Sequence, residues 1–165
     1  MNVDSIYAPP KANLVQDDGR LSGTILVREL RKQSTGKLLL LTIVTLGIYS
    51  AHYIERQTVI INKYINDGNH IAKGLVSTIL LLAYGSVLFI VPSFFFEETH
   101  IINVVGDVLE FVWSILVIVW SFKARNRMNH LLSTVKGEKA WFHGFWTFFF
   151  QYLYVNYKIN QLNEN

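Results

Sequence analysis

Hydrophobic residues are gathered into long blocks along this chain rather than alternating with polar ones. Residues 74–96 contain no charged residue, and residues 101–122 contain only Asp107 and Glu110. An α-helix needs about 20 apolar residues to cross the hydrocarbon core of a membrane. The link between the two blocks, 97–100, is short and polar. The pattern therefore predicts two transmembrane helices joined as a hairpin.

Two further apolar blocks are shorter and interrupted. Residues 38–54 are broken by Gly47, and residues 141–155 begin with aromatic side chains and become polar after Gln151. Both have the minimum length for a crossing, or less. We predict that each block is embedded in the membrane as a re-entrant segment, whose bend must be covered by protein. A plain crossing is the alternative.

The remaining stretches are polar. Residues 1–36 are predicted to form a cytoplasmic tail, and residues 21–37, at its end, have the composition of a short amphipathic helix. Residues 55–67 have apolar positions at helical spacing and predict an amphipathic helix on the membrane surface. The chain thus divides into the polar tail and one membrane domain, 37–165.

Basic residues indicate the topology, because Lys and Arg favour the cytoplasmic side. The region after the second long block is basic, and so is the tail before the first short block. The link 97–100 has two acidic and no basic residues, which places it outside. Both flanks of 38–54 are then cytoplasmic, which favours re-entry over crossing. We expect a multi-pass protein with both termini in the cytoplasm.

Composition supports this class and excludes several functions. Hydrophobic residues make up 51% of the chain, and the mean hydropathy of +0.28 is high for a soluble protein of this size. The fold class predicted is all-α integral membrane. With no cysteine there are no disulfides, thiolate ligands or Cys nucleophile. The net charge of +3 is modest and gives no reason to expect nucleic acid.

No catalytic constellation is recognisable. The sequence has no phosphate-binding loop, hydrolase elbow or pair of zinc ligands. His52, His70 and His143 each lack a second histidine nearby, so we expect hydrogen-bonded interfacial residues rather than ligands. We expect no enzymatic activity, no cofactor and no metal.

The most informative polar pattern lies in the second long block. Seven residues recur at spacings of three and four, which places them on one helix face. They are His100, Asn103, Asp107, Glu110, Ser114, Val117 and Ser121. We call this set the polar stripe. Ionisable residues in a membrane helix usually face a partner, a cavity or water, so the stripe is not expected to face lipid.

Three interpretations of the polar stripe remain open. It packs against residues 74–96, or it lines an interface between copies or a narrow pore, or its carboxylates and His100 bind a cation or move protons. The leading hypothesis is a non-enzymatic protein that acts by association, as a homo-oligomer or as an accessory subunit of a membrane complex. The alternative is a small ion or proton channel or transporter that uses the same stripe.

Short motifs resemble a known family. The stretch "TIVTLGIYSAHYIERQ" is similar to the signature of a small bacterial inner-membrane protein family named only as a domain of unknown function. The shared motif is Thr45, Leu46, Gly47, Ile48 and Tyr49. The opening "IYAPPKANL" and the C-terminal "FQYLYVNYKINQLNE" also resemble such proteins. The resemblance implies the bacterial inner membrane and supplies no catalytic residues.

Two tyrosine-rich stretches also resemble each other. "GIYSAHYIERQ" and "YLYVNYKINQL" each place tyrosines before a polar helical segment. They are consistent with a weak internal repeat flanking the central hairpin, or with a chance likeness between membrane boundaries.

Overall fold

The computed structural model describes residues 23–30, 33–93, 95 and 101–162. All regular structure in these residues is helical, which confirms the all-α class. Residues 23–30 form a short helix. The longer helices are α2 (Thr35–Val44), α3 (Ile48–Lys63), α4 (Lys73–Ser93), α5 (Ile101–Leu131) and α6 (Gly144–Leu162). The whole 97–100 link, which includes His100, and most of the predicted tail lie outside the described residues.

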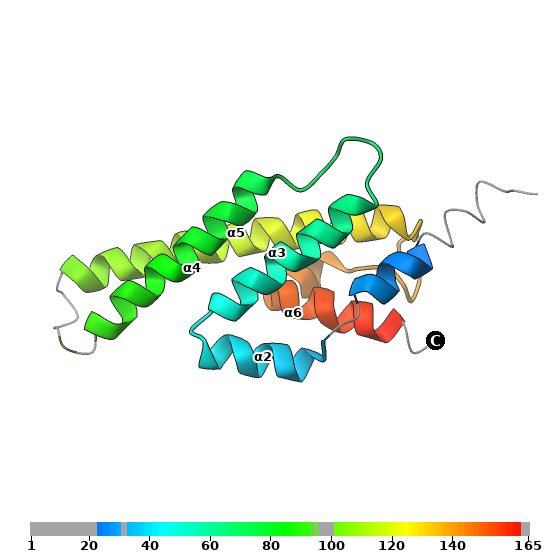
Figure 1. Ribbon diagram of the computed structural model, residues 1–165. Coiled ribbons are helices and arrows are strands. Elements are labelled where there is room, and N and C mark those ends of the chain that lie inside the picture. Colours follow the sequence, from blue (N-terminus) through cyan, green and yellow to red (C-terminus); the bar gives the residue numbers. More distant parts are fainter. Residues whose placement is uncertain (1–22, 31–32, 94, 96–100, 163–165) are drawn as a thin grey trace, which may run out of the picture.

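Helices α4 and α5 form a long hairpin that extends beyond the other helices (Figure 1). Both are long and apolar enough to cross a membrane, with mean hydropathies of 1.8 and 2.0 in their most apolar parts. Only 22% and 6% of the residues there are buried. The core helix of a soluble protein would be mostly buried, so these helices are unlike one.

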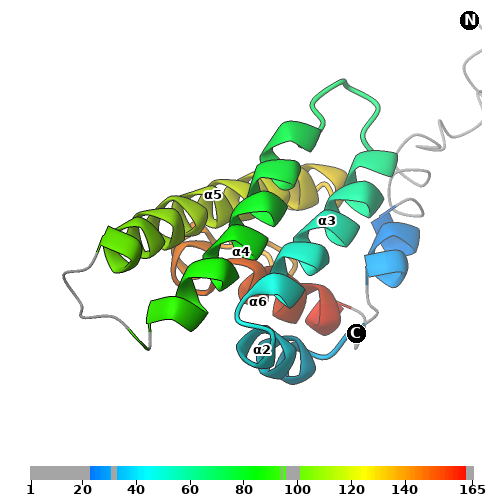
Figure 2. The same cartoon turned by 60° about the vertical axis from the view of Figure 1, so that its left-hand side comes forward.

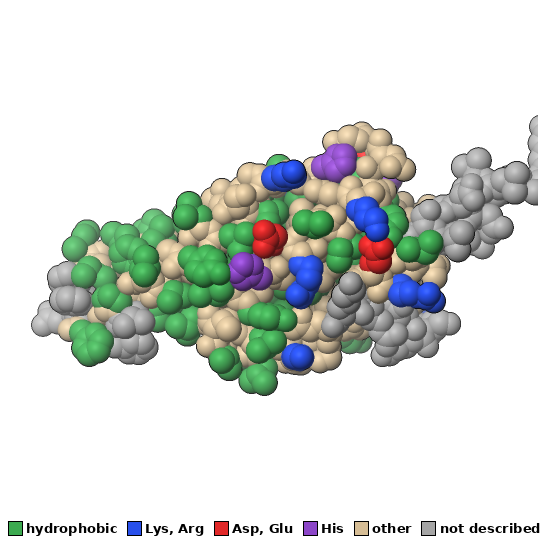
Figure 3. Space-filling view, in the orientation of Figure 1, with side chains coloured by type: hydrophobic (Ala, Val, Ile, Leu, Met, Phe, Trp, Pro, Cys, Tyr) green, Lys and Arg blue, Asp and Glu red, His purple; other side chains and the backbone are tan. Residues whose placement is uncertain are grey.

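The distribution of side chains on the surface also distinguishes the α4–α5 hairpin from the rest of the molecule. On the face seen in Figure 3, hydrophobic side chains gather over the projecting part of the hairpin, whereas the visible charged side chains lie near its other end and over the remaining helices. Helix α5 continues to Leu131, past the predicted end at 122, because one face of its last turns is buried in the core. Ala124, Met128 and Asn129 are buried there.

The bend in the first short block is a tight turn between α2 and α3. Leu46 and Gly47 have φ of 50° and 90°, a left-handed backbone that glycine adopts most easily. The Thr45 hydroxyl joins the two helices: it donates to the carbonyl of Leu41 at 2.8 Å and accepts from the N–H of Tyr49 at 2.9 Å. From the turn, α3 runs back in roughly the opposite direction to α2, and the two helices diverge (Figures 1 and 2). Helix α3 then continues unbroken through position 54, where the sequence suggested a change of segment.

Helix α6 also bends sharply. Gln151 has φ 45° and ψ −127°, which is not helical. The N–H of His143 donates to the hydroxyl of Tyr154 at 3.0 Å. In a straight helix these residues would be about 16 Å apart along the axis, out of reach of a tyrosine side chain. The first half of α6 therefore folds back toward the second.

The core lies where α3, the second half of α5, the second half of α6 and the helix of residues 23–30 meet. Its large side chains are fully buried: Leu26, Leu30, Tyr53, Ile54, Ile61, Trp120, Met128 and Ile159. Trp120 donates from Nε1 to the Thr58 hydroxyl at 2.7 Å. At the surface, Lys63 pairs with Glu29 at 2.8 Å, and this hydrogen bond raises the pKa of Lys63.

Candidate functional site

The polar stripe does not have one environment along α5. Asp107 and Glu110 are exposed, Asn103 and Ser114 are half-buried, and Ser121 is fully buried. The Ser121 hydroxyl donates to the carbonyl of Val117 in its own helix at 2.8 Å, so it needs no other partner. The inner end of the stripe belongs to the core. Only its outer part is available to a ligand or partner.

The structure brings the outer stripe together with the bend motif. Leu46 and Gly47 of the α2–α3 turn and Glu110 and Ser114 of α5 line one cleft of about 240 Å³. We call it the turn cleft. Its other lining residues are Ala83, Ser86, Ile90 and Trp113. A Cβ added at Gly47 would lie 3.9 Å from the Trp113 ring, so the turn rests directly on this indole.

The polar groups of the turn cleft are few. The Ser86 hydroxyl is satisfied by the carbonyl of Leu82 at 2.8 Å. Nε1 of Trp113 is buried and has no hydrogen-bond partner within the part of the chain that the structure describes. A buried donor left unpaired costs about 1–3 kcal/mol. The turn cleft thus offers one carboxylate and two serine side chains in a mostly apolar wall.

Glu110 is the charged residue that lines the turn cleft. No group of three or more His, Asp or Glu that could hold a metal ion is found among the described residues. The turn cleft contains no histidine and no lysine that could act as a base toward its serines. Its carboxylate can accept hydrogen bonds from a polar side chain or from water, or it can bind a cation directly.

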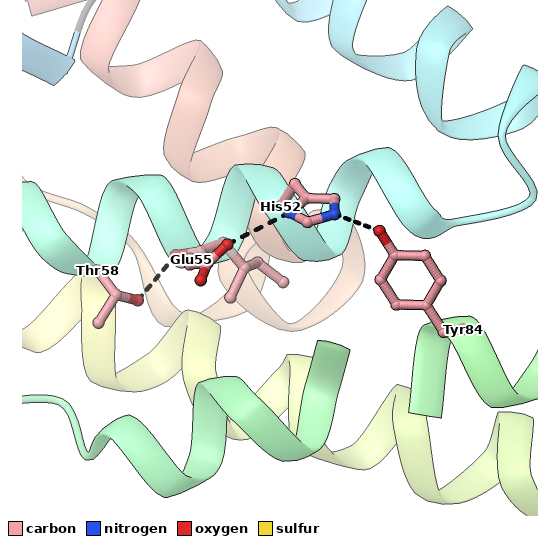
Figure 4. Close-up of polar contacts among 5 residues, drawn as sticks. His52, Glu55, Thr58 and Tyr84 are labelled. Atoms are coloured by element: carbon pink, nitrogen blue, oxygen red, sulfur yellow. Dashed lines mark hydrogen bonds and ion pairs between the residues drawn. The ribbon is translucent and has the colours of Figure 1, made fainter. Parts of the chain in front are cut away.

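A second polar contact joins α3 to α4 outside the turn cleft. Nε2 of His52 lies 2.6 Å from the Tyr84 hydroxyl, and Nδ1 lies 3.3 Å from a Glu55 carboxylate oxygen (Figure 4). The His52 and Glu55 side chains are 47% and 48% exposed. This contact positions α4 against α3. The sequence gives no signal for it, because Tyr84 is far from His52 along the chain.

The two tyrosine-rich stretches meet in space. The rings of Tyr53 and Tyr152 are 6.3 Å apart, and the Tyr53 hydroxyl donates to Oδ1 of Asn156 at 3.1 Å. The amide of Asn156 donates in turn to the carbonyl of Gln33 at 3.2 Å and to the Thr35 hydroxyl at 3.0 Å. Each stretch follows a bend, one at Gly47 and one at Gln151. This network holds the start of α2 against α3 and the second half of α6.

The family described as "Domain of unknown function (DUF4234)" matches residues 33–130. The match includes the α2–α3 turn, the α4–α5 hairpin and the polar stripe, and it agrees with the expectation of an uncharacterised family. No curated protein and no solved structure is significantly similar to the chain.

Proposed function

We propose that this chain, which belongs to the DUF4234 family, is a non-enzymatic, multi-pass protein of the bacterial inner membrane. It acts by association, as a homo-oligomer or as an accessory subunit of a membrane complex. The observation that carries this proposal is the exposure of two carboxylates, Asp107 and Glu110, on the apolar helix α5.

The position of these carboxylates makes exposure to lipid costly. At about 1.5 Å per residue, Asp107 lies about 9 Å and Glu110 about 14 Å along the axis from Ile101. Glu110 is therefore close to the middle of a hydrocarbon core of about 30 Å. The neighbouring side chains Val108 and Phe111 are exposed and apolar. A charged residue at this depth costs about 2.5–3.5 kcal/mol on insertion scales. A partner helix that donates hydrogen bonds to both carboxylates would remove much of this cost.

The first short block supports a re-entrant path. Helix α2 has 10 residues, about 15 Å, which is half of the hydrocarbon core. Its turn reaches the level of Glu110, since both line the turn cleft. Gly47 lies against Trp113, since a Cβ there would be 3.9 Å from the ring, whereas Leu46 is 49% exposed; a turn within the membrane therefore needs further cover at Leu46, which a partner protein would supply. We propose that α2 enters from the cytoplasm and that the amphipathic helix α3 returns there.

Oligomeric state tests the association. Native mass spectrometry in mild detergent would compare the wild type with the double variant Asp107→Leu/Glu110→Leu. We expect the wild type to form a defined assembly or retain a partner, and the variant to lose it. The matched control Val104→Leu changes another exposed position of α5 without removing charge. Association is wrong if the wild type is strictly monomeric and retains no partner.

A second function is favoured by the turn cleft. Its exposed Glu110 carboxylate is a group that water or a cation could use within the membrane. A small channel or transporter built on them predicts ion or proton flux in proteoliposomes, reduced by Glu110→Gln. Absence of flux from the wild type under proton, sodium and potassium gradients would reject this second function.

A further inference from the structure

A separate pocket lies between the loop before α6 and the last turns of α6. It has a volume of about 410 Å³ and is lined by Gly137, Glu138, Lys139, His143, Lys158, Gln161 and Leu162. We propose that this loop pocket binds a phosphate-bearing anion, with the headgroup of an anionic phospholipid as the expected source. The proposal goes beyond association and rests only on the membrane placement proposed above.

Lys158 is the buried charged residue that lines the loop pocket. Its side chain is only 8% exposed. Its ammonium donates to the carbonyl of Lys139 and to Oε1 of Gln161. Among the described residues no carboxylate forms an ion pair with it. A desolvated cation without a counter-ion is disfavoured, and burial accordingly lowers the pKa of Lys158. An anion in the loop pocket would restore the balance of charge.

The other charged groups leave the loop pocket positive. Lys139 and His143 are exposed at its wall. The one acidic lining residue, Glu138, uses Oε2 to accept the N–H of Val135 at 3.0 Å and so caps its own turn. Two ammonium groups thus face one carboxylate that is already engaged. An ammonium group is a compact point charge of the kind that phosphate sites use.

The loop pocket lies at the level expected for lipid headgroups. The start of α6 packs where α5 changes from apolar to basic: a Cβ on Gly144 would lie 3.7 Å from both Phe122 and Arg125. The Arg125 guanidinium donates to the carbonyl of Phe142 at 2.8 Å and lies 5.5 Å from the centre of the Trp141 ring. Tryptophan and basic residues mark the membrane–water interface. A phospholipid phosphate would therefore be at the same depth as His143.

The test uses the full chain in mild detergent. Native mass spectrometry would titrate dioleoyl phosphatidylglycerol against dioleoyl phosphatidylcholine, which has the same acyl chains and no net charge. We expect tighter binding of phosphatidylglycerol and a loss of about fivefold for Lys139→Gln or Lys158→Gln. Lys136→Gln is the matched control, because Lys136 is exposed in the same loop and does not line the loop pocket.

Further measurements distinguish a lipid headgroup from a soluble phosphate compound and can refute the proposal. Displacement of phosphatidylglycerol by millimolar inorganic phosphate would identify a soluble phosphate compound as the source; no displacement identifies the lipid. Lys139→Gln changes an exposed side chain, so it carries the test even if Lys158→Gln fails to fold. Equal binding of both lipids with no binding of phosphate overturns the proposal, as does an equal loss in Lys136→Gln. Lipid binding is read on each oligomeric species, so a lipid-binding monomer would refute association alone.

Discussion

Gly47→Ala gives a direct measure of the α2–α3 turn. Gly47 has φ 90° and ψ −17°, and a side chain in the left-handed region costs about 1–2 kcal/mol. The added methyl group would meet only the Trp113 ring at 3.9 Å, an ordinary contact. Steric overlap therefore adds nothing, and the whole expected loss is backbone strain. For a chain of this size about 1 kcal/mol lowers Tm by roughly 2–4 °C.

Gly36→Ala is the matched control for this substitution. Gly36 is the second residue of α2, and a Cβ there meets nothing within 4 Å. Alanine is a better helix former than glycine, by up to about 1 kcal/mol in a helix interior and less in the first turn, so this variant should be no less stable than the wild type. Thermal unfolding of both variants in the same detergent, followed by tryptophan fluorescence, gives the comparison. If Gly47→Ala is as stable as Gly36→Ala, the left-handed turn and the path argued from it are refuted.

Three further predictions concern the core, the loop pocket and the topology. Thr58→Val leaves Nε1 of Trp120 buried without its acceptor, so we expect a loss of about 1–3 kcal/mol, measured by thermal unfolding against the exposed control Thr78→Val. The pKa of Lys158 is lowered in the folded chain, so between its folded and unfolded pKa values the unfolded chain binds more protons and the stability of the fold should rise with pH. Thermal unfolding measured over this pH range checks this. If Lys158→Gln shows the same rise of Tm with pH as the wild type, Lys158 is not its cause. In this cysteine-free chain, an impermeant maleimide applied from outside should label Glu98→Cys but not Lys37→Cys; labelling of Lys37→Cys would mean that α2 and α3 belong to a full crossing.

The hairpin was predictable because hydropathy and charge act locally along the chain. The bend at Gly47 was predictable for the same reason, since glycine is the residue that a left-handed turn favours. The bend at Gln151 has no such signal: its φ of 45° is held by contacts such as that from the His143 N–H to Tyr154. Those contacts depend on the position of Phe142, whose N–H donates to Asn129 of α5 and whose ring packs against Tyr154. The turn cleft likewise depends on the meeting of residues far apart in sequence.

The polar stripe shows what helical spacing does not determine. A repeat of three and four residues places side chains on one face, but over the 31 residues of α5 the neighbours of that face change. Ser121 is buried next to the core, whereas Asp107 is exposed among the described helices. A pattern on one helix therefore identifies a face, and only the packing of the other helices shows which part of it is free.

The exposed carboxylates also bear on the kind of association. In a symmetric pair whose two-fold axis runs along the membrane normal and passes close to this face, each Asp107 would approach its own copy. Two like charges about 5 Å apart repel by roughly 3 kcal/mol at an effective dielectric constant of about 20, which adds to the cost of removing them from water. A symmetric interface here would need a cation or shared protons between the copies. A different membrane protein that supplies an arginine, lysine or amide would stabilise both carboxylates directly. Of the two forms of association, the electrostatics of Asp107 and Glu110 thus favour an accessory subunit bound to a helix of complementary charge.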